Sequence, residues 1–184
     1  SYPRELFTYS GFGGRWPSAL KYAGYDGIVI TGRAKNLVTI SIHDDQVEIL
    51  DAEGLRGLDT FETQQTIMKG DRGASVLCTG PAGENLSRNA IIANETGSTA
   101  GQGGFGAVMG SKNLKAVSIV GTGLLRIARP REFMQFIAAR KAAGEWLTGA
   151  SQVWARSPLC GGKVEEVMVR KYRRKFGGCF GCPY

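Results

Sequence analysis

Two clusters of glycine limit what this chain can fold into more than any other feature of its sequence. They are Gly11-Phe12-Gly13-Gly14 and Gly101-Gln102-Gly103-Gly104-Phe105-Gly106. The 27 glycines among 184 residues are clustered and not periodic, which excludes a collagen-like repeat. Glycine permits tight turns and lets the backbone approach a ligand closely. The two clusters are therefore the first places to look for a binding site.

Similar patterns follow the two clusters. Each glycine pair precedes a short helical stretch, a strand-like run (28–30 or 117–120) and a closing glycine, Gly32 or Gly121. The spacing is similar and suggests two equivalent loop-to-strand units. Two such loops could hold two similar anionic groups, such as phosphates, because backbone N–H groups can approach an anion closely there. Coincidental turn glycines in an α+β domain are the alternative.

The periodicity of the apolar residues predicts a mixture of strands and short helices. Helical spacing predicts a helix from Trp16 that stops at Gly24. Asp59, with Glu62 three residues later, predicts a capping box and a helix through about Lys69. Strands are predicted at residues 2–8, 27–31, 38–42, 47–49, 75–79 and 115–120, with 27–31 buried and 38–49 forming a hairpin.

The pattern changes near residues 121–129, where we place a domain boundary. It separates residues 1–124 from residues 125–184. Pro130 suits the first position of a helix, and apolar residues follow it on one face. A helix is therefore predicted from Pro130 to about Leu147.

The four cysteines are too few for a disulfide scaffold in a chain of this length. Cys78 lies in an apolar, strand-like run, where a small buried hydrophobe is expected. Cys160 has no evident partner. Cys179 and Cys182 form a CxxC followed by proline, which favours metal, cluster or redox chemistry over a structural disulfide.

The residues alone leave several interpretations of this CxxC open: a corner of an iron–sulfur cluster, half of a zinc site, a thioredoxin-like redox pair or two unrelated cysteines. Zinc or a [4Fe–4S] cluster needs four ligands, and neither Cys78 nor Cys160 belongs to a second CxxC. Further ligands are therefore expected beyond Tyr184, in a longer protein of which this chain is a truncated part.

The net charge is +7, and much of the excess lies near the C-terminus. The basic residues there are Arg170, Lys171, Arg173, Arg174 and Lys175. Such a cluster could bind nucleic acid, an acidic protein or an anionic ligand. No apolar run approaches the ~18 residues that a membrane span needs, so a soluble protein is expected.

Other candidate residues are less specific. The second glycine cluster fits GxGxxG, but the following helix is expected to break at Gly110 and no acidic residue stands about 20 positions later, so a Rossmann fold is not expected. His43 is the only histidine and is predicted to be an exposed turn residue. Glu84 and Asn85 follow a predicted strand and either face a ligand or belong to a helix-capping turn.

Four segments carry a resemblance to a known family. They are Gly13-Gly14 through Leu20-Lys21-Tyr22-Ala23-Gly24-Tyr25-Asp26, Gly80-Pro81-Ala82-Gly83-Glu84-Asn85-Leu86, Gly103-Gly104-Phe105-Gly106-Ala107-Val108-Met109-Gly110-Ser111-Lys112-Asn113-Leu114-Lys115-Ala116, and Cys179-Phe180-Gly181-Cys182-Pro183. With these segments the chain resembles, over nearly its whole length, the aldehyde:ferredoxin oxidoreductase family of tungstopterin enzymes. The resemblance implies an α+β fold with a mixed β-sheet as the base for a bis-pterin tungsten cofactor. Residues 1–124 would be the C-terminal part of that base, and residues 125–184 the beginning of a helical domain ending in the iron–sulfur CxxC.

The resemblance also implies the site residues. Six positions are expected to contact pterin phosphates or a magnesium ion that bridges them: Gly11, Gly13, Ser98, Thr99, Gly101 and Gln102. Well-known members have arginine at the positions of Ser98 and Gln102 and asparagine at that of Gly11, so the phosphate charge must be balanced elsewhere or less fully. Serine at position 98, together with Trp16 and the run Lys21-Tyr22-Ala23-Gly24-Tyr25-Asp26, resembles the branch that contains the tungsten subunit of class II benzoyl-CoA reductases.

The function that the resemblance implies is oxidation of an aldehyde to a carboxylic acid at tungsten, with molybdenum as the alternative metal. Electrons would leave through a [4Fe–4S] cluster held by Cys179 and Cys182 to ferredoxin or an electron-transfer subunit. Lys171, Arg173, Arg174 and Lys175 would dock an acidic ferredoxin or bond to the cofactor, or form a solvated helix face. A cytoplasmic enzyme without membrane association is expected, with a homodimer as one arrangement, and the fragment alone is expected to be inactive.

Two other functions stay open from the sequence. One is a benzoyl-CoA-reductase-type subunit that acts on an acyl-CoA. The other is a non-catalytic module that binds phosphate or nucleic acid. Nucleic-acid binding is disfavoured because aromatic residues do not alternate with the basic ones beyond Tyr172.

Overall fold

The computed structural model describes residues 7–143 of the chain. The chain divides into two compact units, Ser1–Leu125 and Arg126–Tyr184. In the second unit, helix α5 (Pro130–Ala142) begins with the predicted proline. Its predicted end near Leu147 lies outside the described residues. None of the helices in the described part is long and apolar enough to span a bilayer.

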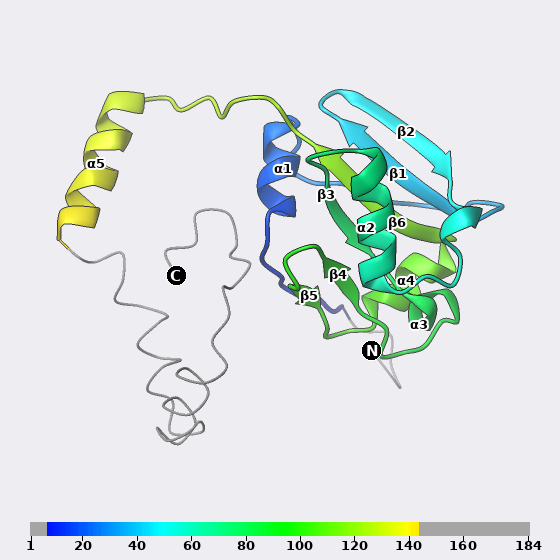
Figure 1. The fold of residues 1–184 in the computed structure, drawn as a ribbon. Coiled ribbons are helices and arrows are strands. Elements are labelled where there is room, and N and C mark those ends of the chain that lie inside the picture. Colours follow the sequence, from blue (N-terminus) through cyan, green and yellow to red (C-terminus); the bar gives the residue numbers. More distant parts are fainter. Residues whose placement is uncertain (1–6, 144–184) are drawn as a thin grey trace, which may run out of the picture. The chain divides into compact units, whose positions relative to one another are not determined.

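The first unit is built on one mixed six-stranded sheet with the order β2-β1-β6-β3-β4-β5 (Figure 1). The strands are β1 (Val38–His43), β2 (Gln46–Asp51), β3 (Ser75–Cys78), β4 (Ile92–Asn94), β5 (Thr99–Ala100) and β6 (Leu114–Val120). Only β1 and β6 pair in parallel, and the other neighbours are antiparallel. The expected α+β fold with a mixed sheet is confirmed, as are the hairpin and the strands predicted at 75–79 and 115–120.

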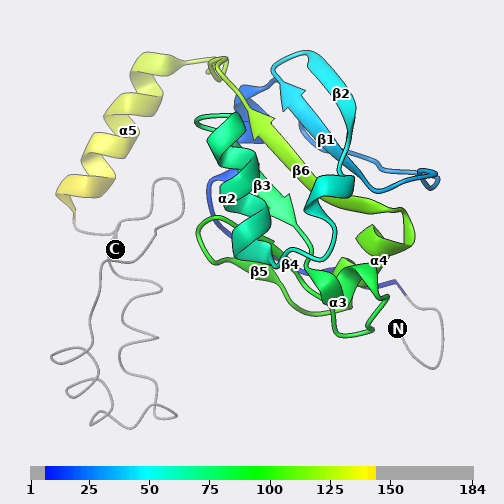
Figure 2. The ribbon, with the colours of Figure 1, turned by 45° about the vertical axis from the view of Figure 1, so that its right-hand side comes forward.

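Short helices cover both faces of this sheet. They are α1 (Trp16–Tyr22), the 3-10 helix η1 (Glu53–Leu55), α2 (Thr60–Gly70), α3 (Pro81–Glu84) and α4 (Phe105–Ser111). Alternate residues of a strand face opposite sides. Leu77 of β3 therefore joins the core cluster under α1, whereas Val76 and Cys78 join the cluster under α2. Figure 2 shows α2 in front of the sheet and the blue α1 partly hidden behind it.

The predicted helix signals are confirmed. Asp59 and Glu62 form both hydrogen bonds of the capping box that begins α2. Trp16 and Leu20 are the buried residues of α1, and the indole N–H of Trp16 donates to the backbone carbonyl of Val117 at 3.3 Å. This bond ties the helix after the first glycine cluster to the centre of the sheet.

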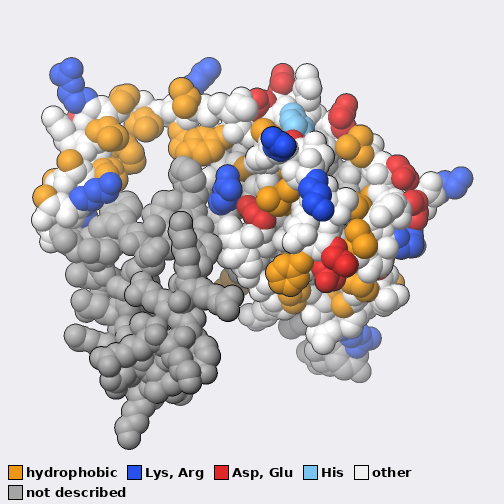
Figure 3. Space-filling view, in the orientation of Figure 1, with side chains coloured by type: hydrophobic (Ala, Val, Ile, Leu, Met, Phe, Trp, Pro, Cys, Tyr) orange, Lys and Arg blue, Asp and Glu red, His pale blue; other side chains and the backbone are white. Residues whose placement is uncertain are grey.

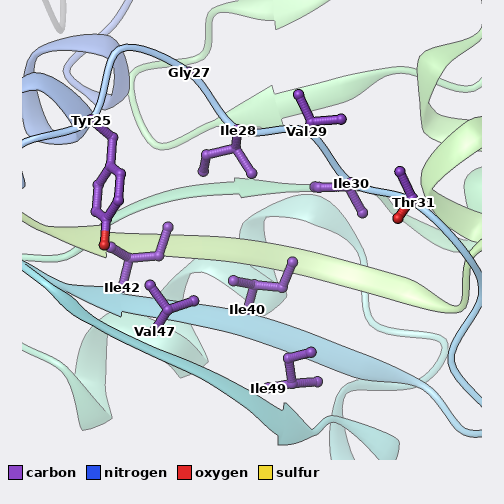
Figure 4. Close-up of a pocket in the computed structure, with 10 residues that line it drawn as sticks. All are labelled: Tyr25, Gly27, Ile28, Val29, Ile30, Thr31, Ile40, Ile42, Val47 and Ile49. Atoms are coloured by element: carbon purple, nitrogen blue, oxygen red, sulfur yellow. The ribbon is translucent and has the colours of Figure 1, made fainter.

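The prediction of a buried strand at residues 27–31 is wrong. The segment pairs with no strand in the described part of the chain, and the side chain of Val29 is 90% exposed. Figure 4 shows it running beside the sheet, with Ile28 directed towards the apolar side chains of β1 and β2 and Val29 away from them. An apolar groove of about 450 Å³ lies between the segment and the hairpin. Of the strand predicted at residues 2–8, only Phe7 and Thr8 are described, and they are not in a strand.

Charged side chains of both signs are interspersed over the face of the first unit that Figure 3 presents. This face therefore carries no single-sign patch of the kind that binds nucleic acid. The basic residues at 170–175, which motivated that alternative, lie outside the described residues.

A buried ion pair joins the sheet to the turn after β3. The ammonium of Lys115, which is fully buried in β6, pairs with the carboxylate of Glu84 and donates to the backbone carbonyl of Leu58 at 2.7 Å. The same carboxylate accepts the backbone N–H of Gly57 at 3.0 Å. Glu84 therefore has a structural role, and of the two interpretations of this turn the structure favours the one without a ligand.

We expect Glu84→Gln to lower the free energy of unfolding by about 3 kcal/mol, because it leaves a buried ammonium without its counter-charge. Chemical unfolding would measure the change. The matched control is Glu132→Gln, which breaks an exposed pair with Arg129 and is expected to change stability little. Equal effects of the two substitutions would contradict the structural role of the pair.

Candidate functional site

The structure brings the two glycine clusters side by side. The side-chain amide of Asn94 donates from Nδ2 to the backbone carbonyl of Gly13 at 2.8 Å. On the other side, the hydroxyl oxygen of Thr8 lies 3.2 Å from where a Cβ on Gly103 would stand. Segments about 90 residues apart in the sequence thus form one surface. The fold, and not local turn chemistry, brings them together.

The six predicted site residues are all accessible on this surface. Gly13 and Ser98 are half-buried, and the others are exposed: Gly11, Thr99, Gly101 and Gln102. Gly11 and Gln102 contribute to one small cavity of about 280 Å³, which residues 7–10 also line. The structure therefore brings Gly11 and Gln102 together, whereas Gly13, Ser98, Thr99 and Gly101 lie outside the lining of this cavity.

Some glycines of the second cluster are required by packing. A Cβ on Gly104 would lie 2.2 Å from the carbonyl oxygen of Arg88, and one on Gly106 would lie 2.4 Å from that of Ile91. A Cβ on Gly110 would lie 1.9 Å from the carbonyl oxygen of Gly83. These distances are far below van der Waals contact, so α4 lies directly against the backbone of residues 83–91. Gly110 is the second-last residue of α4, which ends at Ser111, so the helix stops close to where the sequence placed its end.

Other glycines have no such requirement. A Cβ on Gly11 would meet no atom within 4 Å, and one on Gly101 would meet only ordinary contacts at 3.8 Å and beyond. Neither residue has a positive φ angle. Packing among the described residues therefore does not explain glycine at these two positions, whereas the approach of a ligand would.

The polar groups available to a ligand at this site are those that are not already used in hydrogen bonds within the protein. The backbone N–H of Ser98 donates to Oδ1 of Asn94 at 3.1 Å, so Ser98 can offer its hydroxyl. The exposed Arg15, directly after the first cluster, is a nearby source of positive charge in the sequence. Backbone amides, a hydroxyl and a cation suit an anionic ligand.

The described residues contain no group of three or more His, Cys, Asp or Glu side chains that could hold a metal ion. His43 is exposed, as predicted, and lies at the end of β1 with Nε2 2.9 Å from Oδ2 of Asp71. Burial raises the pKa of the Cys78 thiol to about 11, so this thiol stays protonated at neutral pH and behaves as the expected small hydrophobe. Cys160, Cys179 and Cys182 lie outside the described residues.

Sequence reasoning missed Asn94, which bonds to Gly13 of the first cluster and to the backbone of Ser98, one of the predicted site residues. It is 2% exposed and follows two strand residues of β4 at the start of Asn94-Glu95-Thr96-Gly97. Asparagine three residues before glycine is a turn signal, because its side chain often bonds to the backbone two residues later. The signal predicts a turn but does not reveal the bond to Gly13, which depends on the tertiary fold.

Comparison with known proteins gives a consistent family assignment. The model of the aldehyde ferredoxin oxidoreductase N-terminal domain matches residues 3–121. A tungsten-containing aldehyde ferredoxin oxidoreductase from Pyrococcus furiosus is 45% identical over 131 residues, which cover 70% of this chain and 22% of the relative. An aliphatic sulfonate oxidoreductase, WOR-like subunit, from the same organism is 39% identical over 89% of this chain and 32% of the relative.

A solved structure is similar in both sequence and fold. It is the active site complex BamBC of benzoyl coenzyme A reductase in complex with 1,5-dienoyl-CoA. The match has 42% identity and a TM-score of 0.65, and covers 72% of this chain and 22% of that chain. The chain thus spans between 22% and 32% of the length of these relatives.

We expect Gly110→Ala and Gly101→Ala to differ sharply in stability. The added methyl at position 110 would collide with the backbone of Gly83, so the free energy of unfolding should fall by about 2 kcal/mol or more. At position 101 the methyl enters open space, and the change should stay within about 0.5 kcal/mol. Chemical unfolding of both variants would measure this. A large loss at position 101 would show that packing, and not ligand access, requires that glycine.

Proposed function

Because this chain belongs to the aldehyde ferredoxin oxidoreductase family, we propose that its two glycine loops bind the phosphate ends of a bis-pterin tungsten cofactor. The loops are Gly11–Gly14 and Ser98–Gly104. Gly11 and Gly13 in the first, and Ser98, Thr99, Gly101 and Gln102 in the second, are the proposed contacts. A magnesium ion bridging the phosphates is part of the proposal.

The observation that carries this proposal is the adjacency of two accessible glycine loops. The side chain of Asn94 bonds to the backbones of Gly13 in the first loop and Ser98 in the second, so two similar anions bound there would lie close together. The free space beside Gly11 and Gly101 supports ligand approach at one point on each loop. The chain's own part is to hold the anionic ends of the cofactor by backbone amides and the Ser98 hydroxyl, with Arg15 as a proposed counter-charge.

We propose oxidation of an aldehyde to a carboxylic acid as the reaction of the whole protein. Water supplies the added oxygen, and two electrons and two protons are released. The bound tungsten cofactor supplies this redox chemistry, while the protein positions it. A [4Fe–4S] cluster on Cys179, Cys182 and ligands beyond Tyr184 would pass the electrons singly to ferredoxin. The basic residues Lys171 to Lys175 would steer that acidic carrier.

A second function is favoured by one specific observation: Ser98 stands where the well-known aldehyde-oxidising members have arginine. The benzoyl coenzyme A reductase complex, with 42% identity over 72% of this chain, is similar enough for this alternative to be considered. On this alternative the protein is the tungsten subunit of a complex that acts on an acyl-CoA, with an electron-transfer subunit in place of free ferredoxin.

The cofactor proposal predicts that Gly101→Ala and Gly11→Ala lower tungsten and pterin content without lowering stability. The methyl would occupy space that the ligand needs, and disturbance next to a bound metal centre typically costs about 10-fold or more in affinity. The full-length protein, purified without oxygen, would be analysed for tungsten by mass spectrometry and for pterin by fluorescence after oxidation. Wild-type protein without pterin, or fully loaded variants, would refute the proposal.

The same preparations distinguish the two reactions. We expect aldehyde-dependent reduction of ferredoxin and no reaction with a cyclic dienoyl-CoA. The opposite pattern, together with a second subunit that co-purifies, would replace aldehyde oxidation by the acyl-CoA function while leaving the cofactor proposal intact.

A further inference from the structure

One side chain joins the two loops, and it is buried. Asn94 lies at the end of β4 and is only 2% exposed. Its Oδ1 accepts three hydrogen bonds from the second loop region: the N–H and hydroxyl of Thr96, at 3.0 and 2.8 Å, and the N–H of Ser98, at 3.1 Å. Its Nδ2 donates to Gly13 in the first loop, 81 residues away.

These partners fix the orientation of the amide. The partners of Oδ1 include two backbone N–H groups, which can only donate, and a backbone carbonyl such as that of Gly13 can only accept. An aspartate at position 94 would turn an oxygen towards the Gly13 carbonyl, and an apolar residue would remove all four of these hydrogen bonds, whose partner groups are half-buried. Among side chains of this size, asparagine satisfies both loops at once.

The first loop is shaped to receive this amide. A Cβ on Gly14 would lie 2.1 Å from Nδ2 of Asn94, and Gly14 has a φ of 100°, which favours glycine. Gly14 is therefore glycine because Asn94 occupies the space beside it. The pair sets how closely the first loop approaches Ser98.

We propose that Asn94 is a positioning residue that fixes the separation of the two phosphate-binding loops, and so lets both ends of one cofactor bind together. This inference rests on the proposed function of the loops. Asn94 bonds directly to Gly13 and Ser98, two of the six proposed contacts, and with 2% exposure it has almost no surface with which to touch a ligand itself. It can therefore affect cofactor binding only by fixing the relative positions of the two loops.

The test compares Asn94→Ala with Thr63→Val in the full-length protein, purified without oxygen. Thr63 is also fully buried and bonds through its hydroxyl to the backbone carbonyl of Asp59 at 2.6 Å, in α2. Both substitutions remove buried hydrogen bonds and should lower the melting temperature. Only Asn94→Ala should lower the tungsten and pterin content per folded subunit, by about 10-fold, the lower end of the usual effect of losing a group that orients cofactor contacts.

The possible outcomes distinguish a failure of the proposed function from a failure of the role of Asn94. Wild-type protein without pterin would refute the proposed function, and the role of Asn94 with it. Loaded wild type with an equally loaded, folded Asn94→Ala would refute the role of Asn94 alone, and so would an equal loss of cofactor in Thr63→Val. If Asn94→Ala does not fold, Asn94→Ser retains a small polar group, and the same content measurement on it supports or overturns the inference.

Discussion

Close backbone approach at glycine is the constraint on which the structure of the first unit depends. Helix α4 lies against residues 83–91 at distances that leave no room for a Cβ at Gly104, Gly106 or Gly110. This contact fixes the beginning of α4 and with it the second loop. The buried Lys115–Glu84 pair ties the beginning of this 83–91 segment to the sheet. The start of α4, directly after the second loop, is thus fixed, whereas a Cβ on Gly11 or Gly101 would meet no close contact.

The local elements could be predicted from the sequence because their causes are local. The capping box of Asp59 and Glu62, the hairpin alternation and the apolar spacing of α1 all involve residues close together in the chain. The buried strand at 27–31 could not be predicted correctly, because an apolar run becomes a strand only where a neighbour pairs with it.

The candidate site could be predicted only in part. The repeated glycine pattern drew attention to both loops, and the structure brings them together. The predicted equivalence of the two loop-to-strand units is wrong, because residues 27–31 form no strand whereas the second unit continues into β6. It did not separate the glycines that packing requires, such as Gly104, from those with free space, such as Gly101, because that distinction depends on atoms far away in the sequence. The role of Asn94 could not be predicted for the same reason, since its bond to Gly13 joins residues that are 81 positions apart in the sequence. The metal-ligand prediction for Cys179 and Cys182 stays a prediction.

The central claim is that two neighbouring backbone loops hold two phosphate ends of one cofactor. An experimental structure of the full-length protein, purified without oxygen and with its cofactor bound, tests it most directly. The account predicts one phosphate group within hydrogen-bond distance of residues 11–13 and a second within hydrogen-bond distance of residues 98–102. Phosphates bound elsewhere, or at one loop only, would contradict it.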